Sequence, residues 1–336
     1  MIKILVTGGA GYIGSHTLVA LHQNKFQPII IDNLSNSSIS NIKGAEKICK
    51  TSFTFYNIDC CDEKQMNTIF EQEDGIEGVI HFAAYKSVEE SVREPKKYFE
   101  NNIGSLETLL NIMQKHGVDN LIFSSSCTVY GSPDKLPVNE SAPFKKAASP
   151  YGESKQRCEE ILQKSSINCV SLRYFNPIGT HESGLIGDCS FDKASNLVPI
   201  ITETAIGKRE KVTVFGNDYN TPDGTCIRDY IHVVDLANAH VHSLNYLTKH
   251  CGKHVYNIGT GKGLSVLEII QAFEQSTQQT LNVSIGPRRE GDIEQIYSDI
   301  SLSSKKLQWK AEMSLENALK SAWKWEQQKD NTTAWL

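Results

Sequence analysis

A strand that runs directly into a glycine-rich turn is the strongest constraint in this sequence. Residues 2 to 7 (Ile-Lys-Ile-Leu-Val-Thr) are β-rich and almost continuously apolar, as expected of a buried parallel strand. The next residues, Gly-Gly-Ala-Gly-Tyr-Ile-Gly at 8–14, satisfy Gly-x-Gly-x-x-Gly and open a helical stretch at Tyr12. Such glycines permit a tight turn and close approach of a pyrophosphate to the free N–H groups of the helix. The turn therefore predicts a dinucleotide-binding fold.

Asp32 makes this prediction more specific. It ends the second strand-like segment, 18 residues after Gly14, where a carboxylate accepts hydrogen bonds from the ribose hydroxyls of an adenosine. The same charge would repel a 2′-phosphate, so NAD is favoured over NADP. A glycine-rich turn without any cofactor is the alternative interpretation of the pattern.

Strand-like and helix-like segments alternate over the first 175 residues. This alternation is typical of a doubly wound parallel sheet. The expected strands are 2–7, 28–32, 52–58, 78–83, 120–124 and 168–175, and the expected helices are 12–23, 62–72, 95–116 and 149–165. We predict an α/β fold: a Rossmann-type doubly wound parallel sheet with a smaller C-terminal α/β substrate lobe.

The regular alternation of strand-like and helix-like segments ends after Phe175. Residues 176–196 are rich in Gly, Ser, Asp and His, which indicates a boundary or a substrate loop. We predict an NAD-binding Rossmann domain over 1–175 and the second lobe over 176–336, with an approximate boundary that the chain can cross again. Ser265-Val-Leu-Glu268 matches a capping box at the start of a helix. Further helices are expected near 196–207, over 233–249 and from 314, with a strand at 212–215.

Composition excludes several classes of partner. With 34 basic and 39 acidic residues the net charge is -5, so no overall positive field attracts nucleic acid. No apolar stretch approaches the roughly 18 residues that span a bilayer, and no secretory-type segment follows Met1, so we expect no membrane partner and a cytoplasmic location. The nine cysteines show no Cys-x-x-Cys spacing, and His240 and His242 point to different sides of a helix. We therefore predict no metal site.

Three residues are suited to oxidation of an alcohol. Tyr151 and Lys155 are four residues apart, so both project from one side of a helix. A nearby ammonium favours phenolate, and we expect it to lower the pKa of Tyr151. Ser126 follows the strand 120–124, at the edge where open α/β sheets bind ligands, and its hydroxyl can donate to the substrate oxygen. An exposed helix pair is the alternative for Tyr151 and Lys155 alone.

These motifs together resemble the extended short-chain dehydrogenase/reductase family, and within it the nucleotide-sugar 4-epimerases. The resemblance covers nearly the whole chain. The matching segments are 6–17, 32–34, 81–83, 122–126, 128–131, 149–152, 172–177, 215–219, 223–225, 228–233 and 287–292. It implies interconversion of UDP-glucose and UDP-galactose by C4 epimerisation, through a transient 4-keto sugar and enzyme-bound NAD.

The resemblance also implies roles for individual residues. Ser126, Tyr151 and Lys155 would be catalytic. With these three, the cofactor would contact Gly8, Gly11, Tyr12, Ile13, Gly14, Asp32, Asn33, Leu34, Ser35, Asn36, Ser37, Asp59, Cys60, Phe82, Ala83, Ala84, Lys86, Asn101 and Phe175. With Lys86, Ser126 and Tyr151, the UDP-sugar would contact Asn176, Asn196, Leu197, Thr213, Val214, Phe215, Arg228, Arg289, Asp292 and Ile296. A homodimer through helices 95–116 and 149–165 is expected as well.

Some positions depart from the family pattern. Tyr85 and Glu89 replace a common Leu and Gly, and Cys127 replaces an Ala as a small filler. Ile296 stands where a large Tyr excludes N-acetyl sugars and a small residue admits them, so this specificity stays open. The alternatives are a nucleotide-sugar 4,6-dehydratase and a non-catalytic NAD-binding regulator. A dehydratase of this kind needs an Asp-Glu pair directly after the serine at the strand end, and this chain has Cys127 and Thr128 there.

Overall fold

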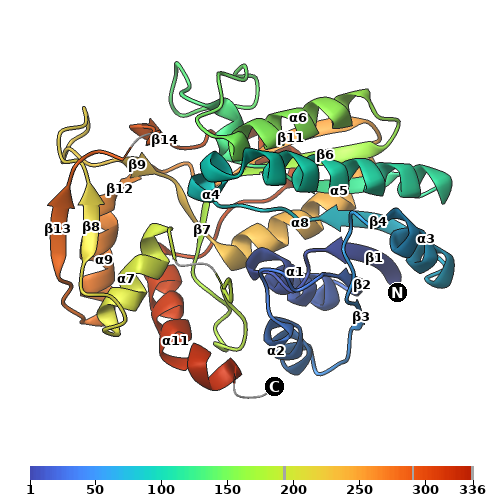
Figure 1. The fold of residues 1–336 in the computed structure, drawn as a ribbon, viewed down its shortest axis with the longest axis horizontal. Coiled ribbons are helices and arrows are strands. Elements are labelled where there is room, and N and C mark those ends of the chain that lie inside the picture. Colours follow the sequence, from blue (N-terminus) through green and yellow to red (C-terminus); the bar gives the residue numbers. More distant parts are fainter. Residues whose placement is uncertain (192–193, 290, 334–336) are drawn as a thin grey trace.

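Seven parallel strands form the main sheet, in the order β11-β6-β5-β4-β1-β2-β3 (Figure 1). The computed structural model describes residues 1–191, 194–289 and 291–333. The strands are β1 (Ile2–Thr7), β2 (Phe26–Ile31), β3 (Thr54–Tyr56), β4 (Ile76–His81), β5 (Asn120–Ser124), β6 (Asn168–Tyr174) and β11 (Lys253–Ile258). The strand order reverses between β1 and β4, which confirms the predicted Rossmann-type topology and places a ligand crevice beside β1.

Helices cover both faces of this sheet, because consecutive side chains of each buried strand point to opposite sides. Ile4 and Val6 of β1 pack in one apolar cluster, whereas Leu5 packs in another. The first cluster includes residues of α1 (Tyr12–Gln23), α2 (Ile39–Cys49), α8 (Val233–Leu247) and α10 (Ser301–Leu307). The second includes residues of α3 (Glu63–Gln72), α5 (Pro95–Lys115) and α6 (Pro150–Lys164). The expected ranges agree closely with α1, α3, α5, α6 and α8, but α2, α10 and the short α4 (Val88–Arg93) were not predicted.

β2 begins two residues earlier than predicted. Proline has no N–H group to donate to a neighbouring strand, so it is usual at the start of a strand. In the structure Pro28 lies inside β2, opposite Ile4 of β1. Pairing with β3 starts only at Ile29, so at Pro28 the strand is paired on one side and tolerates the missing N–H group.

The second lobe has its own apolar core. Val214 of β8 (Val212–Phe215) and Ile201 of α7 (Leu197–Ala205) pack with Phe273 of α9 (Val266–Thr277) and Leu319 of α11 (Leu315–Thr333). β8 pairs with β13 (Val283–Gly286), and β9 (Ile227–Arg228) lies between β12 (Leu264–Ser265) and β14 (Gln295–Ile296). Figure 1 shows these elements grouped at one end of the molecule, beside the main sheet.

The chain returns from the second lobe to the main sheet. β7 (Asn176–Ile178) pairs in parallel with β10 (Tyr230–His232), at the point where the chain comes back. α8 then packs against α1, and β11 extends the sheet beside β6. The division into 1–175 and 176–336 stays a prediction; residues 233–258 cross back to the main sheet, and α10 packs there as well.

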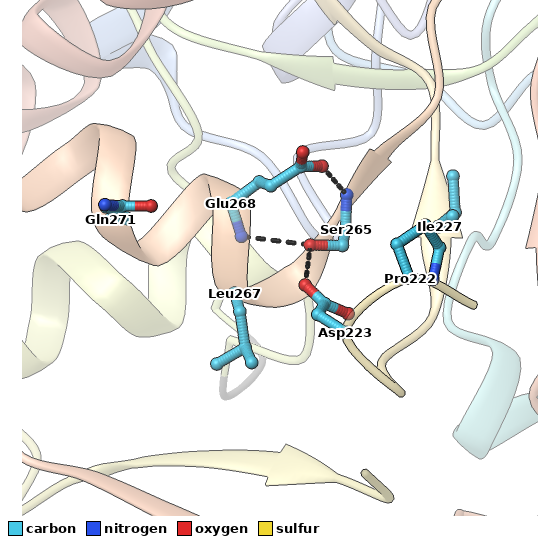
Figure 2. Close-up of a pocket in the computed structure, with 7 residues that line it drawn as sticks. All are labelled: Pro222, Asp223, Ile227, Ser265, Leu267, Glu268 and Gln271. Carbon is cyan, nitrogen blue, oxygen red and sulfur yellow. Dashed lines mark hydrogen bonds between the residues drawn. The ribbon is translucent and has the colours of Figure 1, made fainter. Parts of the chain in front are cut away.

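The predicted capping box opens α9. Ser265 Oγ accepts a hydrogen bond from Glu268 N at 3.0 Å, and Glu268 Oε2 accepts one from Ser265 N at 2.7 Å. Figure 2 shows that the same Ser265 hydroxyl also donates to Asp223, at the edge of a surface pocket. This bond ties the loop before β9 to α9, and β9 carries Arg228.

Candidate active site

The glycine turn between β1 and α1 leaves no room for side chains. Gly8 has a φ of 71°, and a Cβ there would lie 2.7 Å from Ala83 N. A Cβ on Gly14 would lie 2.3 Å from the carbonyl oxygen of Gly8. Gly11, the N-cap of α1, makes no side-chain cap, and the first turn of the helix has no acidic residue. The positive end of α1 is therefore open to an anion, which fits the pyrophosphate of a dinucleotide.

Asp32 stands directly after β2 with its carboxylate largely buried. Oδ2 accepts from Ala10 N at 3.0 Å, and Oδ1 accepts from Leu34 N at 2.9 Å and from Ser37 Oγ at 2.8 Å. Burial raises the pKa of this carboxyl, and these three hydrogen bonds oppose the rise. A carboxylate can accept about four hydrogen bonds, so Asp32 keeps capacity for a ribose hydroxyl.

The other predicted cofactor residues also gather at the carboxyl ends of the strands. The turn after β1 holds Gly8, Gly11, Tyr12, Ile13 and Gly14, and the segment after β2 holds Asp32, Asn33, Leu34, Ser35, Asn36 and Ser37. Asp59 and Cys60 follow β3, Phe82, Ala83, Ala84 and Lys86 follow β4, and Phe175 follows β6, while Asn101 lies on α5. Asn33 Nδ2 bonds Asp59 Oδ2 at 3.1 Å, which joins two of these groups.

A segment that we call the strap, residues 179–191, is anchored on this edge of the first domain. Asn41 on α2 exchanges two hydrogen bonds with the backbone of Gly187, at 3.0 and 3.1 Å. Lys86 Nζ lies 3.3 Å from Asp188 Oδ2, and the Tyr12 hydroxyl donates to the carbonyl oxygen of Gly179. Two predicted cofactor contacts, Tyr12 and Lys86, and Asn41 on α2 therefore hold the strap.

The three candidate catalytic residues meet where β5 ends. Ser126 is the N-cap of a short 3-10 helix, η1 (Cys127–Tyr130). Tyr151 and Lys155 lie one turn apart on α6, whose start is fixed by a hydrogen bond from Gly152 N to Ser149 Oγ at 3.2 Å. Lys155 Nζ lies 6.0 Å from the centre of the Tyr151 ring. The structure thus brings the trio together at the predicted edge.

The predicted effect of Lys155 on Tyr151 is not what the structure gives. Burial raises the pKa of the Tyr151 phenol well above its usual range, and the nearby Tyr174 adds to the rise. A hydrogen bond with Ser126 acts in the opposite direction. Burial outweighs the expected lowering by the ammonium, because the buried phenolate would lose its hydration. Lys155 Nζ itself donates to the carbonyl oxygen of Ser124, at 2.7 Å. Burial also lowers the pKa of Lys155 to about 8.

Two arginines of the second lobe converge on one carboxylate. Arg289 Nη2 donates to Asp292 Oδ1 at 2.8 Å, and Arg228 Nη2 lies 3.9 Å from the same oxygen. The Arg289 guanidinium also lies 5.5 Å from the centre of the Phe215 ring. Two positive charges against one negative charge suit a diphosphate, which both guanidinium groups can bind.

The remaining predicted substrate residues are spread over the second lobe and its junction with the first. Asn176 lies on β7, Asn196 is the N-cap of α7 and Leu197 its first residue, and Thr213, Val214 and Phe215 lie on β8. The Val214 side chain is buried in the core of the lobe, so only its backbone can face a ligand.

Ile296 and Cys127 share a small apolar cluster with Phe175 at the junction of the lobes. Ile296 is 3% exposed. Burial raises the pKa of the Cys127 thiol to about 12, which fits a packing role rather than a reactive thiol. The residue at position 296 therefore helps to set the volume beside Phe175.

Sequence reasoning missed a buried ion pair next to the trio. Arg173 Nη2 on β6 lies 2.6 Å from Glu159 Oε2 on α6, with side chains that are 6% and 3% exposed. The available signal was an arginine inside an otherwise apolar strand, because a charge on a buried strand needs a partner. Glu159 gave no comparable signal, since α6 carries several charged residues that are exposed.

The described residues hold neither a candidate metal site nor a membrane-spanning helix. Within 1–191, 194–289 and 291–333, no group of three or more His, Cys, Asp or Glu side chains is placed to hold a metal ion. His240 and His242 bond separate backbone carbonyls, those of Leu236 and Leu307. No helix in the described part of the chain has the length and apolar character to cross a membrane.

The chain is similar to known proteins over nearly its whole length. The family model described as GDP-mannose 4,6 dehydratase matches residues 5–322. A UDP-glucose 4-epimerase of Dictyostelium discoideum is 48% identical over 330 residues, which cover 96% of this chain and 95% of that protein.

Two solved structures are also similar over almost their whole length. One is a UDP-glucose 4-epimerase from Stenotrophomonas maltophila with bound NAD and formylated UDP-arabinopyranose, with a TM-score of 0.95 and 43% identity. The other is a UDP-glucose 4-epimerase from Bifidobacterium longum in complex with NAD+ and UDP, with a TM-score of 0.94 and 43% identity. Each comparison covers 98% of this chain and 99% of the other.

Proposed function

The chain belongs to the UDP-glucose 4-epimerase family, within the wider family of the matching model, and on this premise we propose how its residues carry out the reaction. It is an NAD-dependent isomerase that interconverts UDP-glucose and UDP-galactose by inverting C4 of the sugar. The meeting of Ser126, Tyr151 and Lys155 at the end of β5 carries the assignment of the catalytic residues.

Tyr151 is the acid and base of the reaction. Its phenolate removes the proton of the sugar 4-hydroxyl, and the phenol returns a proton to the keto oxygen when C4 is reduced from the opposite face. Ser126 hydrogen-bonds the same oxygen and orders both proton transfers. NAD, when bound, supplies the acceptor and donor of the C4 hydride and adds the positive charge of its nicotinamide ring to the site. Lys155 keeps a second positive charge in the same buried site, and positive charge favours the phenolate that burial disfavours.

The second lobe holds the nucleotide so that the sugar can turn over. Arg228 and Arg289 bind the diphosphate, and Asp292 orients both guanidinium groups. An inverting reaction of this kind needs firm anchoring of the UDP group together with a sugar pocket loose enough for rotation. The apolar cluster around Ile296 and Phe175 suits one wall of such a loose pocket, because it offers the sugar no strong hydrogen bond.

The dehydratase alternative is not favoured by these residues. Elimination of water needs an additional acid and base near the serine at the strand end. Cys127 and Thr128 stand at that place, and the Cys127 thiol stays protonated because burial raises its pKa to about 12. A non-catalytic NAD-binding regulator is likewise disfavoured. Such a protein would not need Ser126, Tyr151 and Lys155, and all three are in place.

The function is tested by incubating the purified protein with UDP-galactose, without added reductant, and following the C4 epimer by NMR. A parallel incubation with UDP-N-acetylgalactosamine tests the range of sugars. Conversion of UDP-galactose to UDP-glucose is expected. Conversion of neither sugar would overturn the assignment, and formation of a stable 4-keto-6-deoxy sugar would support the dehydratase instead.

A homodimer is the proposed assembly, formed by α5 and α6 of two copies. These two helices lie side by side on one face of the sheet, and a shallow surface depression between them is lined by residues of both, including Leu110 and Ile161. Sedimentation equilibrium tests the proposal: twice the chain mass of 37.4 kDa is expected, and the mass of a single chain contradicts it.

The physiological setting is also a proposal: galactose metabolism in the cytoplasm. It is supported by the sugar nucleotides of the reaction and by the reduced state that nine free cysteines suit. Restored growth on galactose of a cell that lacks its own C4 epimerase is the expected result. Failure despite soluble expression would contradict it.

A further inference from the structure

Three consecutive serines at the end of β5 each bond a residue of α6. Ser124 accepts from Lys155 through its carbonyl oxygen, Ser125 donates to Glu159 through its hydroxyl, and Ser126 hydrogen-bonds Tyr151. The α6 partners follow one another at intervals of four residues, so they share one face of the helix. The contact between Ser125 and Glu159 is the one of the three that involves no candidate catalytic residue.

Glu159 is held from the other side by Arg173. Arg173 Nε donates to Glu159 Oε1 at 2.9 Å, and Nη2 donates to Oε2 at 2.6 Å. The Arg173 guanidinium lies over the rings of Tyr130 and Phe144, at 4.9 and 5.0 Å from their centres. The carboxylate therefore connects α6 to β6 and to the end of β5 with little freedom to move.

A buried ion pair of this kind is poorly explained by stability alone. Removing two charges from water is expensive, and apolar residues of similar size often stabilise such a place as well or better. A fixed two-pronged contact does define the position of one element against another, because its geometry is directional. The element that it fixes here carries Tyr151 and Lys155.

We propose that Glu159 and Ser125 are positioning residues for the epimerisation, which hold the end of β5 against α6 so that Ser126 faces Tyr151. This inference rests on the proposed function, since it concerns the same site. Ser125 is adjacent to Ser126 in the chain, so a shift of the Ser125 backbone carries the Ser126 hydroxyl with it. Misplacement of reacting groups by about 1 Å can cost about 100-fold in rate.

The electrostatics act in the same direction. Burial lowers the pKa of Lys155, and the neighbouring Cys158 and Glu159 oppose that lowering. Glu159 thus helps to keep the ammonium charged while its geometry places the helix. Neither effect reaches the nucleotide-binding arginines, which belong to the second lobe.

Ser125→Ala is the decisive variant, because it removes the hydroxyl and leaves the Glu159–Arg173 pair in place. The matched control is Ser243→Ala on α8, another fully buried serine, whose hydroxyl donates to the Ala239 carbonyl oxygen at 2.7 Å. For both, kcat and KM for UDP-galactose are measured well below the melting temperature, which is measured as well. Ser125→Ala is expected to lower kcat by about 10- to 100-fold with KM within about twofold, and Ser243→Ala to leave both within about twofold.

Glu159→Gln and the double variant with Ser125→Ala test whether the two residues act through one contact. The double variant is expected to lose about as much kcat as the worse of the two single variants, because one contact can be broken only once. Losses that multiply, or an unchanged kcat in Ser125→Ala, overturn the inference. A wild type without turnover would overturn the proposed function as well, which separates the two failures.

Discussion

The Lys155 ammonium donates to the carbonyl oxygen of Ser124 at 2.7 Å, and this bond directs its charge to the end of β5. Burial lowers the pKa of this ammonium to about 8. Above its pKa the group loses its proton, and the positive charge that favours the Tyr151 phenolate disappears with it. We therefore expect kcat to fall as the pH rises through about 8.

Initial rates with saturating UDP-galactose between about pH 6 and 10 check this expectation. Lys155→Met should be slow throughout and should lack the alkaline decline, because no ammonium remains to titrate. A wild-type kcat that is constant up to about pH 10 would contradict the role of the charge.

Tyr151→Phe removes the proton-transferring oxygen and little else. The ring stays in its place, so UDP binding measured by calorimetry should remain close to that of the wild type. The rate of epimerisation should fall by about 10² to 10⁴-fold, the usual contribution of a positioned acid and base. Turnover at the wild-type rate would show that another group handles the proton.

Arg228→Met should raise the KM for UDP-galactose by about tenfold or more with little change in kcat, because the diphosphate is bound equally in the ground and transition states. Arg289→Met should have a smaller effect, since the Arg289 side chain is 55% exposed and its charge is screened by water. Arg288→Met is the matched control: its guanidinium bonds Asp218 at 2.7 Å, away from Asp292. Equal KM values for the Arg228 variant and this control would contradict the assignment.

Ile296 is expected to limit the size of the sugar 2-substituent. Ile296→Ala enlarges the space beside Phe175 and should raise the turnover of UDP-N-acetylgalactosamine relative to UDP-galactose. Ile296→Tyr fills that space and should lower the same ratio. The ratio of the two initial rates, followed by NMR, is the measurement, and a ratio that is equal in both variants would remove residue 296 from the pocket wall.

Asp188→Asn should weaken the hold of the strap by removing its ion pair with Lys86. If the strap helps to retain NAD, the cofactor should leave the variant faster, which gel filtration followed by measurement of the remaining NAD detects. Asp218→Asn breaks a comparable exposed pair, with Arg288, outside the strap and serves as the control. Retention equal to that of the control would separate the strap from cofactor binding.

Much of the fold follows from local patterns in the sequence. The bounds of β1, α1, β5 and β8 agree with prediction, because each is set by an apolar period together with a glycine or polar residue at its end. α2 escaped prediction because its N-cap, Ser38, lies inside a run of serines and asparagines that resembles a loop. β11 escaped because Lys253–Ile258 (Lys-His-Val-Tyr-Asn-Ile) is neither continuously apolar nor regularly alternating, and no local pattern tells which sheet a returning strand joins.

The sequence predicted which residues meet at the candidate site, but not the pKa of Tyr151 or the hydrogen-bond partner of Lys155. Tyr151 and Lys155 were placed on one face by helical spacing alone. The direction of the Lys155 ammonium depends on a backbone carbonyl of β5, and the pKa of Tyr151 depends on burial by elements that are distant in the sequence. Arg173 and Glu159 are 14 residues apart, and only the packing of α6 on the sheet brings them together.

The position of β11 has a consequence for engineering. The polypeptide builds six strands of the main sheet, leaves to form part of the second lobe, and returns to add the seventh beside β6 before it leaves again. A single proteolytic nick between the lobes would therefore not yield two autonomous fragments, because an N-terminal fragment ending near residue 175 would expose an unsatisfied edge on β6. Chimaeras with a relative should exchange residues 179–229 together with the parts after β11 that pack in the second lobe, leaving α8, β11 and α10 with the sheet that they complete or cover.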